Sequence, residues 1–220
     1  MLLLCDEDEI LQRAYIRPVL FQGMRLAPWL LGLLVLLVSV LLDEPLALWL
    51  SAHRPSSLTL LFVLVTALIS TLVIFFLMTS LFLWEERKRE WIPALWASFF
   101  TTALATVLLK LLTHRARPFH LADFLPLDGI SYSFAWWNSS FPSWHAAAVF
   151  SALPLLNKEF PSLKGAWIFF AVVISVGRLF VGVHYLSDVI AGSLLGLIIG
   201  TSFVRLEETS HFFRRGIFRK

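Results

Sequence analysis

Two clusters of polar residues in the second half of the chain have the composition needed to handle phosphate. Lys110 is followed at a distance by Arg117, and Arg178 precedes His184. Arginine presents a planar fork that suits phosphate oxygens, and lysine adds a point charge. Asp188 follows His184 at helical spacing, and a carboxylate bonded to one imidazole nitrogen makes the other nitrogen a better nucleophile or base. Together these residues predict phosphoryl transfer.

A third cluster, FPSWH over residues 141–145, stands immediately before an apolar run. His145 titrates in the range needed to protonate a leaving group. Ser143 offers a hydroxyl and a backbone N–H to a phosphate oxygen, at what we expect to be a helix N-terminus, which favours anions. Each of these residues alone has a plain structural explanation, such as a helix cap, a buried polar pair or a headgroup contact. Phosphate chemistry is favoured because they occur together.

The composition places these clusters in a membrane protein. The chain has 220 residues, of which 58% are hydrophobic and 15% charged, and its mean hydropathy is +0.78. A soluble domain carries roughly 25% charged residues. The net charge of +3 gives no indication of nucleic-acid binding. The single cysteine, Cys5, allows no internal disulfide and no paired-cysteine metal site.

Six apolar segments predict six transmembrane helices, because a bilayer core of about 30 Å needs roughly 20 apolar residues per helix. The predicted fold class is therefore all-α, a polytopic membrane protein built as a six-helix bundle in one domain over residues 1–220. Residues 1–25 are expected to form a cytoplasmic segment with a short interfacial helix, residues 26–204 the core, and residues 205–220 a cytoplasmic tail. The six segments are Leu26–Leu42, Leu58–Trp84, Ile92–Leu112, Ala146–Leu156, Ala166–Val183 and Leu186–Val204.

Basic residues set the expected orientation of this bundle. They gather before the first segment, between the second and third, between the fourth and fifth, and after the sixth. The positive-inside rule makes that side cytoplasmic, with both termini inside. Asp43–Ser56 and Thr113–Phe141 are then outer loops, and the three polar clusters lie at the outer ends of the helices.

The sixth segment also carries a packing signal. Small residues at a spacing of four allow two helices to approach closely in lipid. Asp188 lies one such step before the first of them and is therefore expected to face the bundle. These small residues are Gly192, Gly196 and Gly200.

The three clusters resemble the motifs of the type 2 phosphatidic acid phosphatase family, KxxxxxxRP, PSGH and SRxxxxxHxxxD. They stand here as KLLTHRARP over Lys110–Pro118, PSWH over Pro142–His145 and GRLFVGVHYLSD over Gly177–Asp188. The resemblance covers the second half of the chain by motif and all of it by helix layout. Two positions depart from the pattern, since Trp144 replaces the usual glycine and Gly177 the usual serine.

The resemblance implies a metal-independent phosphatase that needs no cofactor and works through a phosphohistidine. It implies that His184 is the nucleophile, with Asp188 as its orienting partner. His145 would be the general acid in the first step and the base that activates water in the second. The phosphate would be held by the remaining motif residues, which are Lys110, Arg117, Ser143, the backbone of Trp144, and Arg178.

The expected function is that of a lipid phosphate or pyrophosphate phosphatase in the cytoplasmic membrane of a bacterium, with its active site facing the periplasm. Candidate substrates are undecaprenyl pyrophosphate, phosphatidylglycerol phosphate, phosphatidate and lipid A phosphate. The expected partners are this lipid and the bilayer, without nucleic acid, and the sequence indicates no oligomeric state. Two alternatives stay open: a lipid phosphotransferase on the same scaffold, and a non-catalytic lipid-binding protein with a relic site, for which Trp144 and Gly177 are the arguments.

Overall fold

The computed structural model describes residues 26–68, 71–121 and 139–210, and within these ranges every regular element is a helix. Helices are the expected form for long apolar segments, because all their backbone hydrogen bonds close within the segment. Short 3-10 segments connect several of them. In chain order the elements are α2 (Leu26–His53), α3 (Ser56–Leu68), α4 (Thr71–Trp84), η1 (Glu86–Trp91), α5 (Ile92–Thr113), η2 (Pro118–His120), α6 (Trp144–Glu159), η4 (Pro161–Leu163), α7 (Lys164–Phe180) and α8 (Leu186–Ser210).

The surface of the bundle is apolar, as a membrane protein requires. Among the described residues, four helices are long and apolar enough to cross a membrane: α2, α5 with η1, α7 with η4, and α8. Large apolar side chains point outward, and Leu41, Leu112 and Trp84 are 77%, 78% and 91% exposed. Such extensive apolar exposure suits lipid better than water. The chain is therefore a polytopic helical membrane protein, as predicted.

The number of membrane crossings is a separate matter. The second predicted segment is divided between α3 and α4, and the fourth is the 16-residue α6. Each of these three helices is shorter than a full span of about 20 residues. The count of six crossing helices therefore stays a prediction.

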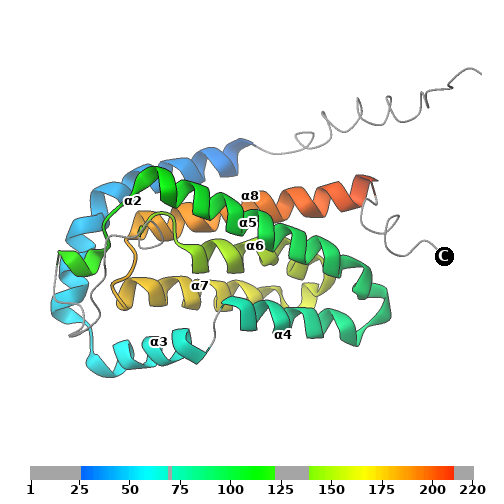
Figure 1. The fold of residues 1–220 in the computed structure, drawn as a ribbon, viewed down its shortest axis with the longest axis horizontal. Helices are drawn as coiled ribbons and strands as arrows, with labels where there is room; N and C mark the ends of the chain where they lie inside the picture. Colours follow the sequence, from blue (N-terminus) through cyan, green and yellow to red (C-terminus); the bar gives the residue numbers. More distant parts are fainter. Residues whose placement is uncertain (1–25, 69–70, 122–138, 211–220) are drawn as a thin grey trace, which may run out of the picture.

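Helix α6 is the central element of the bundle. It contacts α4, α5, α7 and α8, and Figure 1 shows α5, α6, α7 and α8 lying alongside one another. From α4 to α8 successive helices run in opposite directions, so α5 and α7 end where α6 and α8 begin (Figure 1). The three polar clusters lie at or next to these four helix ends, and they therefore meet at one end of the bundle.

The closest helix contact, between α6 and α8, confirms the packing role predicted for the three glycines. A Cβ atom on Gly192, Gly196 or Gly200 would overlap a backbone oxygen of α6 or of its N-cap residue. Gly196 faces the backbone of Ala147 and Ser151, whose nitrogen would lie 2.8 Å from the added Cβ atom. Asp188, one step earlier, is fully buried as expected. The glycines thus bring the start of α8 against the start of α6.

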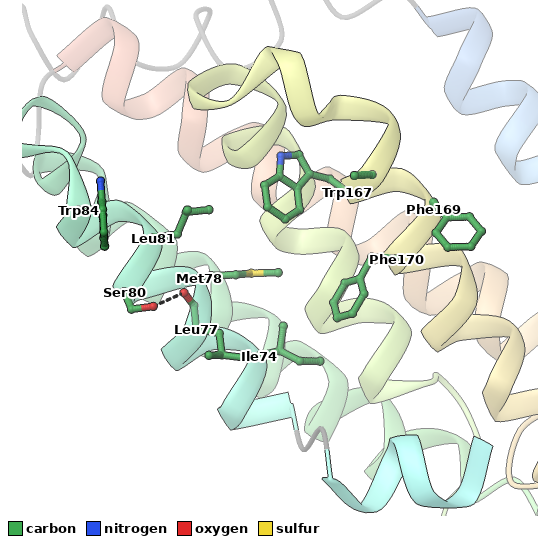
Figure 2. Close-up of a pocket in the computed structure, with 10 residues that line it drawn as sticks. Ile74, Leu77, Met78, Ser80, Leu81, Trp84, Trp167, Phe169 and Phe170 are labelled. Atoms are coloured by element: carbon green, nitrogen blue, oxygen red, sulfur yellow. Dashed lines mark hydrogen bonds between the residues drawn. The ribbon is translucent and has the colours of Figure 1, made fainter. Parts of the chain in front are cut away.

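An apolar groove of about 730 Å³ lies between α4 and α7. Figure 2 shows Ile74 and Met78 on α4 facing the rings of Trp167 and Phe170 on α7. Its lining contains no titratable side chain, and chemistry of the predicted kind needs such groups. The candidate site therefore lies elsewhere.

The predicted outer loop over Asp43–Ser56 is wrong for most of its length, because α2 continues to His53. Asp43 is buried, and its carboxylate accepts hydrogen bonds from the backbone N–H and the hydroxyl of Ser187. The polar residue that suggested a loop is therefore satisfied inside the bundle, and the helix does not need to end there.

Helix α8 extends to Ser210, so residues 205–210 of the predicted cytoplasmic tail continue this helix. Lys158 of α6 forms an ion pair with Glu208 in the last turns of α8, which ties this extension to the bundle. The predicted interfacial helix within residues 1–25 lies outside the described residues, as does most of the predicted outer loop Thr113–Phe141.

We predict that Gly196→Ala lowers the thermal stability of the protein in detergent. The added methyl group meets backbone atoms of α6, which cannot move aside as a flexible side chain does. Overpacking of this kind costs about 1–3 kcal/mol, and each kcal/mol lowers Tm by roughly 2–4 °C in a chain of this size.

Gly165→Ala is the matched control, because an added Cβ at Gly165 meets nothing within 4 Å. Its Tm should stay within about a degree of wild type or rise slightly, since alanine favours the helix. Equal Tm values for the two variants would contradict the close α6–α8 contact.

Candidate active site

The predicted polar residues surround a cavity of about 380 Å³ at the end of the bundle where α5 and α7 end and α6 begins. The lining combines imidazoles and cationic side chains with small or apolar side chains of α5 and an indole of α6. Two predicted residues, Ser143 and Asp188, are buried behind this lining. The lining residues are Ala103, Thr106, Val107, Lys110, Arg117, Trp144, His145, Arg178 and His184.

His184 is held in the form that a nucleophile requires. Its Nδ1 atom lies 2.7 Å from the backbone oxygen of Ser140. A carbonyl oxygen can only accept, so Nδ1 carries the proton and donates it. The lone pair is then on Nε2, the remaining ring nitrogen of a side chain that lines the cavity.

Burial keeps this imidazole neutral. Burial lowers the pKa of His184 to about 4, while the nearby carboxylate of Asp188 opposes the shift and Arg178 and Arg117 add to it. A neutral imidazole at physiological pH retains the lone pair that a nucleophile donates.

The expected direct bond between Asp188 and His184 is not present. Oδ2 of Asp188 lies 3.7 Å from Nδ1 of His184, beyond hydrogen-bond distance. That oxygen instead accepts from the backbone N–H of Tyr185 at 2.7 Å and from the hydroxyl of Ser140. Ser140 therefore links the two residues, with its hydroxyl on Asp188 and its carbonyl on His184. The physical reason is that His184 precedes α8, so the pair does not share a regular helix face.

Three cations reach the cavity from three segments. Lys110 in the last turn of α5 donates to the backbone oxygen of Ser139, and Arg117 donates to the backbone oxygen of Val183 at 3.4 Å. Arg178 is buried, and its Nε and Nη1 atoms have no hydrogen-bond partner among the described residues. Buried guanidinium groups are costly to leave unpaired. Arg178 is therefore the side chain best prepared to receive an oxyanion.

The N-terminus of α6 supplies further donors, though not all those expected. The backbone N–H of Ser143 donates to the backbone oxygen of Asp188 at 2.9 Å. This N–H is therefore already paired, contrary to the prediction that it binds phosphate. Its buried hydroxyl has no partner among the described residues. Backbone N–H groups in the first turn of a helix lack intrahelical partners, and here they belong to the helix that begins at Trp144. This arrangement favours an anion.

The two departures from the family pattern leave the polar residues in place. Trp144 opens α6, and the positive-φ non-glycine found in the described residues is His114, so the indole needs no left-handed backbone. Its ring packs edge-on against Phe99 at 5.2 Å and forms part of the cavity wall. A Cβ at Gly177 would collide with the ring of Phe62 on α3. Glycine at this position therefore serves the contact between α3 and α7.

Sequence reasoning missed three residues of this end of the bundle, which are Asp43, Arg115 and Ser140. Ser140 acts through its backbone oxygen, which no sequence pattern reveals. Arg115 lies inside the first motif at a position that the family leaves free, yet it forms ion pairs with Asp43 and Asp188. The available signal was its unusual place, a basic residue on the side predicted to be external.

A model of the PAP2 superfamily matches residues 91–212 of this chain. Decaprenylphosphoryl-5-phosphoribose phosphatase of Mycobacterium tuberculosis is 35% identical over 117 residues, which are 52% of this chain and 60% of that protein. Lipid A 1-phosphatase of Rhizobium etli is 38% identical over 111 residues, 49% of this chain and 47% of that protein. The match thus spans about half to three fifths of these relatives.

A solved structure extends the likeness to the fold. The crystal structure of a transmembrane PAP2-type phosphatidylglycerolphosphate phosphatase from Bacillus subtilis superposes with a TM-score of 0.63 and 22% sequence identity. The superposition covers 82% of this chain and 96% of that one. The helical arrangement is therefore shared beyond the matched motifs.

We predict that His184 is neutral at pH 6, with its proton on Nδ1. Selective ¹⁵N-histidine NMR in detergent would show this tautomer, assigned by the signal lost in His184→Ala. The midpoint of its protonation should lie near pH 4, because burial disfavours the charged ring. A charged His184 at pH 6 would contradict the geometry.

The lowered pKa of His184 also makes the stability of the fold depend on pH. In the unfolded chain a histidine binds a proton below about pH 6.5, whereas His184 in the folded protein resists it until about pH 4. As pH falls through this window the unfolded state binds more protons, so stability decreases.

Proposed function

Because the chain belongs to the PAP2 superfamily, we propose that it is a membrane lipid phosphatase that removes phosphate or pyrophosphate through a phosphohistidine on His184. The observation that carries this proposal is the cavity itself. It brings a neutral imidazole, a second imidazole and three cations against an apolar wall. A lipid phosphate has the matching parts, an anionic headgroup and an apolar chain.

The cationic and the apolar lining residues would recognise different parts of such a substrate. Lys110, Arg117 and Arg178 surround the phosphate position, and charge-assisted bonds from arginine and lysine are the strong ones. Ala103 and Val107 on α5 extend this lining toward the side of the helix that would face the lipid. We infer that the lipid enters between α5 and α6, with its chain still in the bilayer.

The first step transfers the phosphoryl group to the protein. Nε2 of His184 attacks phosphorus, a P–N bond forms, and the bond from phosphorus to the lipid oxygen breaks. His145 gives its proton to that oxygen. The phosphate brings the negative charge that allows His145 to carry a proton among three cations. Arg178 and the α6 N-terminus stabilise charge on the equatorial oxygens.

The second step restores the protein. His145, now neutral, takes a proton from water, whose oxygen attacks phosphorus as the P–N bond breaks. Inorganic phosphate leaves, and His184 regains its lone pair with the proton still on Nδ1, where Ser140 holds it. The Ser140 carbonyl thus keeps the ring in one orientation through both steps.

The names of the relatives support the proposed substrate class. Their names describe phosphatases of a decaprenyl-linked sugar phosphate and of lipid A, and the structural neighbour is a phosphatidylglycerolphosphate phosphatase. The feature common to these substrates is a phosphate on a membrane-anchored lipid. We extend that class to this chain, with undecaprenyl pyrophosphate, phosphatidylglycerol phosphate, phosphatidate and lipid A phosphate as candidates.

We propose that the cavity faces the periplasm of a bacterial inner membrane, with both termini in the cytoplasm. Arg87, Lys88, Lys158 and Lys164 lie at the opposite end of the bundle from the cavity. Their position supports this orientation through the positive-inside rule.

We predict that the purified protein releases phosphate from at least one of the four candidate lipids in detergent, and that His184→Ala lowers the rate at least a thousandfold. His53→Ala is the matched control, because this exposed histidine bonds, among the described residues, to the backbone oxygen of Trp49 on its own helix. Its rate should equal that of wild type. Phosphate release retained by His184→Ala would disprove the phosphohistidine, and no release from any lipid would disprove the phosphatase.

We predict that His145→Asn separates the two steps when the leaving group is varied. The variant should lose about 10²–10⁴ in kcat on a lipid phosphate, the usual contribution of a general acid and base. With p-nitrophenyl phosphate, whose leaving group needs no proton, it should give a burst of one p-nitrophenolate per protein. Slow turnover should follow, because water is not activated.

Stopped-flow absorbance measures this burst. Full steady-state activity of His145→Asn on a lipid phosphate would show that another group supplies the proton. A burst that persists in His145→Asn combined with His184→Ala would remove His184 from the first step.

A further inference from the structure

The guanidinium of Arg115 lies between two buried carboxylates. Its Nη1 atom donates to Oδ1 of Asp188 at 2.8 Å and to the hydroxyl of Ser187 at 2.7 Å, and its Nη2 atom donates to Oδ2 of Asp43 at 2.7 Å. The side chain also lies over the ring of Tyr185, 4.3 Å from its centroid. These protein partners occupy Arg115, which is absent from the cavity lining.

Asp43 brings α2 into this cluster. Its side chain is 2% exposed, and Oδ1 accepts the backbone N–H of Ser187 at 2.8 Å. Ser187 is in the first turn of α8, where backbone N–H groups lack intrahelical partners. Asp43 therefore caps the start of α8 from another helix, while it holds Arg115.

The cluster connects to His184 through two further bonds. Arg115 fixes one oxygen of Asp188, and the other oxygen accepts from Tyr185 and Ser140. Ser140 in turn presents its carbonyl to Nδ1 of His184 at 2.7 Å. The orientation of Asp188 thus decides where the hydrogen-bond partner of His184 lies.

We propose that Asp43 and Arg115 form a positioning pair that fixes Asp188, and through Ser140 the imidazole of His184, so that α2 is part of the catalytic end of the bundle. The proposal rests on the function proposed above. It goes beyond the motifs, because Arg115 is at a position that the motif leaves free and Asp43 lies outside the residues matched by the family model.

The electrostatics of the cluster explain why the pair matters. Two buried carboxylates share one guanidinium. Without that cation they would repel each other, and the negative charge near His184 would be uncompensated. His184 would then bind a proton more readily, and Asp188 would lose the bond that fixes Oδ1.

The test compares Arg115→Gln, Arg115→Lys and Asp43→Asn by steady-state kinetics on the lipid that wild type hydrolyses. Because Arg115 does not line the cavity, we expect kcat to fall about 10–100-fold in Arg115→Gln, the usual effect of losing a residue that orients a reacting group, with KM within about twofold. Arg115→Lys should retain part of kcat, since an ammonium keeps the charge but lacks the bridging fork.

Glu44→Gln is the matched control for Asp43→Asn, because Glu44 is the exposed neighbour of Asp43 on α2. It should behave as wild type, whereas Asp43→Asn should lose kcat. The double variant Asp43→Asn, Arg115→Gln should lose no more than the worse single variant, since the two residues act as one unit. An unchanged kcat, or a raised KM at constant kcat, would overturn the proposal.

A second readout does not depend on turnover. In ¹⁵N-histidine NMR the protonation midpoint of His184 should rise by about one pH unit or more in Arg115→Gln and stay near the wild-type value in Arg115→Lys and Glu44→Gln. An unchanged midpoint in Arg115→Gln would overturn the proposal. The charged and titratable groups that face His184 or line its surroundings, and that stay intact in this comparison, are Asp43, Lys110, Arg117, His145, Arg178, Tyr185 and Asp188.

The two readouts separate the two levels of inference. Wild-type protein that is inactive on every lipid would end the proposed function, and the NMR midpoint would then decide on the positioning pair alone. If Arg115→Gln does not fold in detergent, the kinetics of Asp43→Asn against Glu44→Gln decide, and equal kcat values would overturn the pair.

Discussion

The contact between α6 and α8 is the constraint on which the site depends. Glycine at three successive turns of α8 allows its backbone to meet that of α6. At this distance the backbone N–H of Ser143 reaches the backbone oxygen of Asp188. The starts of two helices are thereby joined, and with them the second and third polar clusters. A larger side chain at any of these glycines would separate the helices and, with them, the groups that would share one phosphate.

The same end of the bundle concentrates charge that a membrane protein otherwise avoids. Cations and buried carboxylates are expensive in or near hydrocarbon unless they pair or serve a function. Asp43 and Asp188 are satisfied by Arg115 and by hydroxyl and backbone donors. Arg178, in contrast, keeps donors without partners among the described residues. This difference distinguishes the groups that hold the site together from the group that is prepared for an anion.

Of the two departures, Trp144 contributes to the cavity wall and Gly177 to the contact between α3 and α7, and both leave the charges of the site unchanged. Trp144 adds an aromatic surface beside the cavity through its contact with Phe99, and Gly177 makes room for Phe62. Neither position supplies an acid, a base or a cation. Neither departure therefore changes the charged groups that line the cavity.

The sequence by itself determined the class of fold, the bounds of α5, α6 and α7 to within three residues, the glycine contact and the residue types that surround the cavity. These follow from hydropathy and spacing, which are local properties. The tertiary structure decided that α2 continues past Asp43, that Ser140 bonds to His184 in place of Asp188, and that Arg115 joins two carboxylates. These depend on which backbone and side-chain atoms meet across helices far apart in the sequence. A hydrogen bond selects its partner by distance and direction, and neither is encoded in the spacing of residues along one segment.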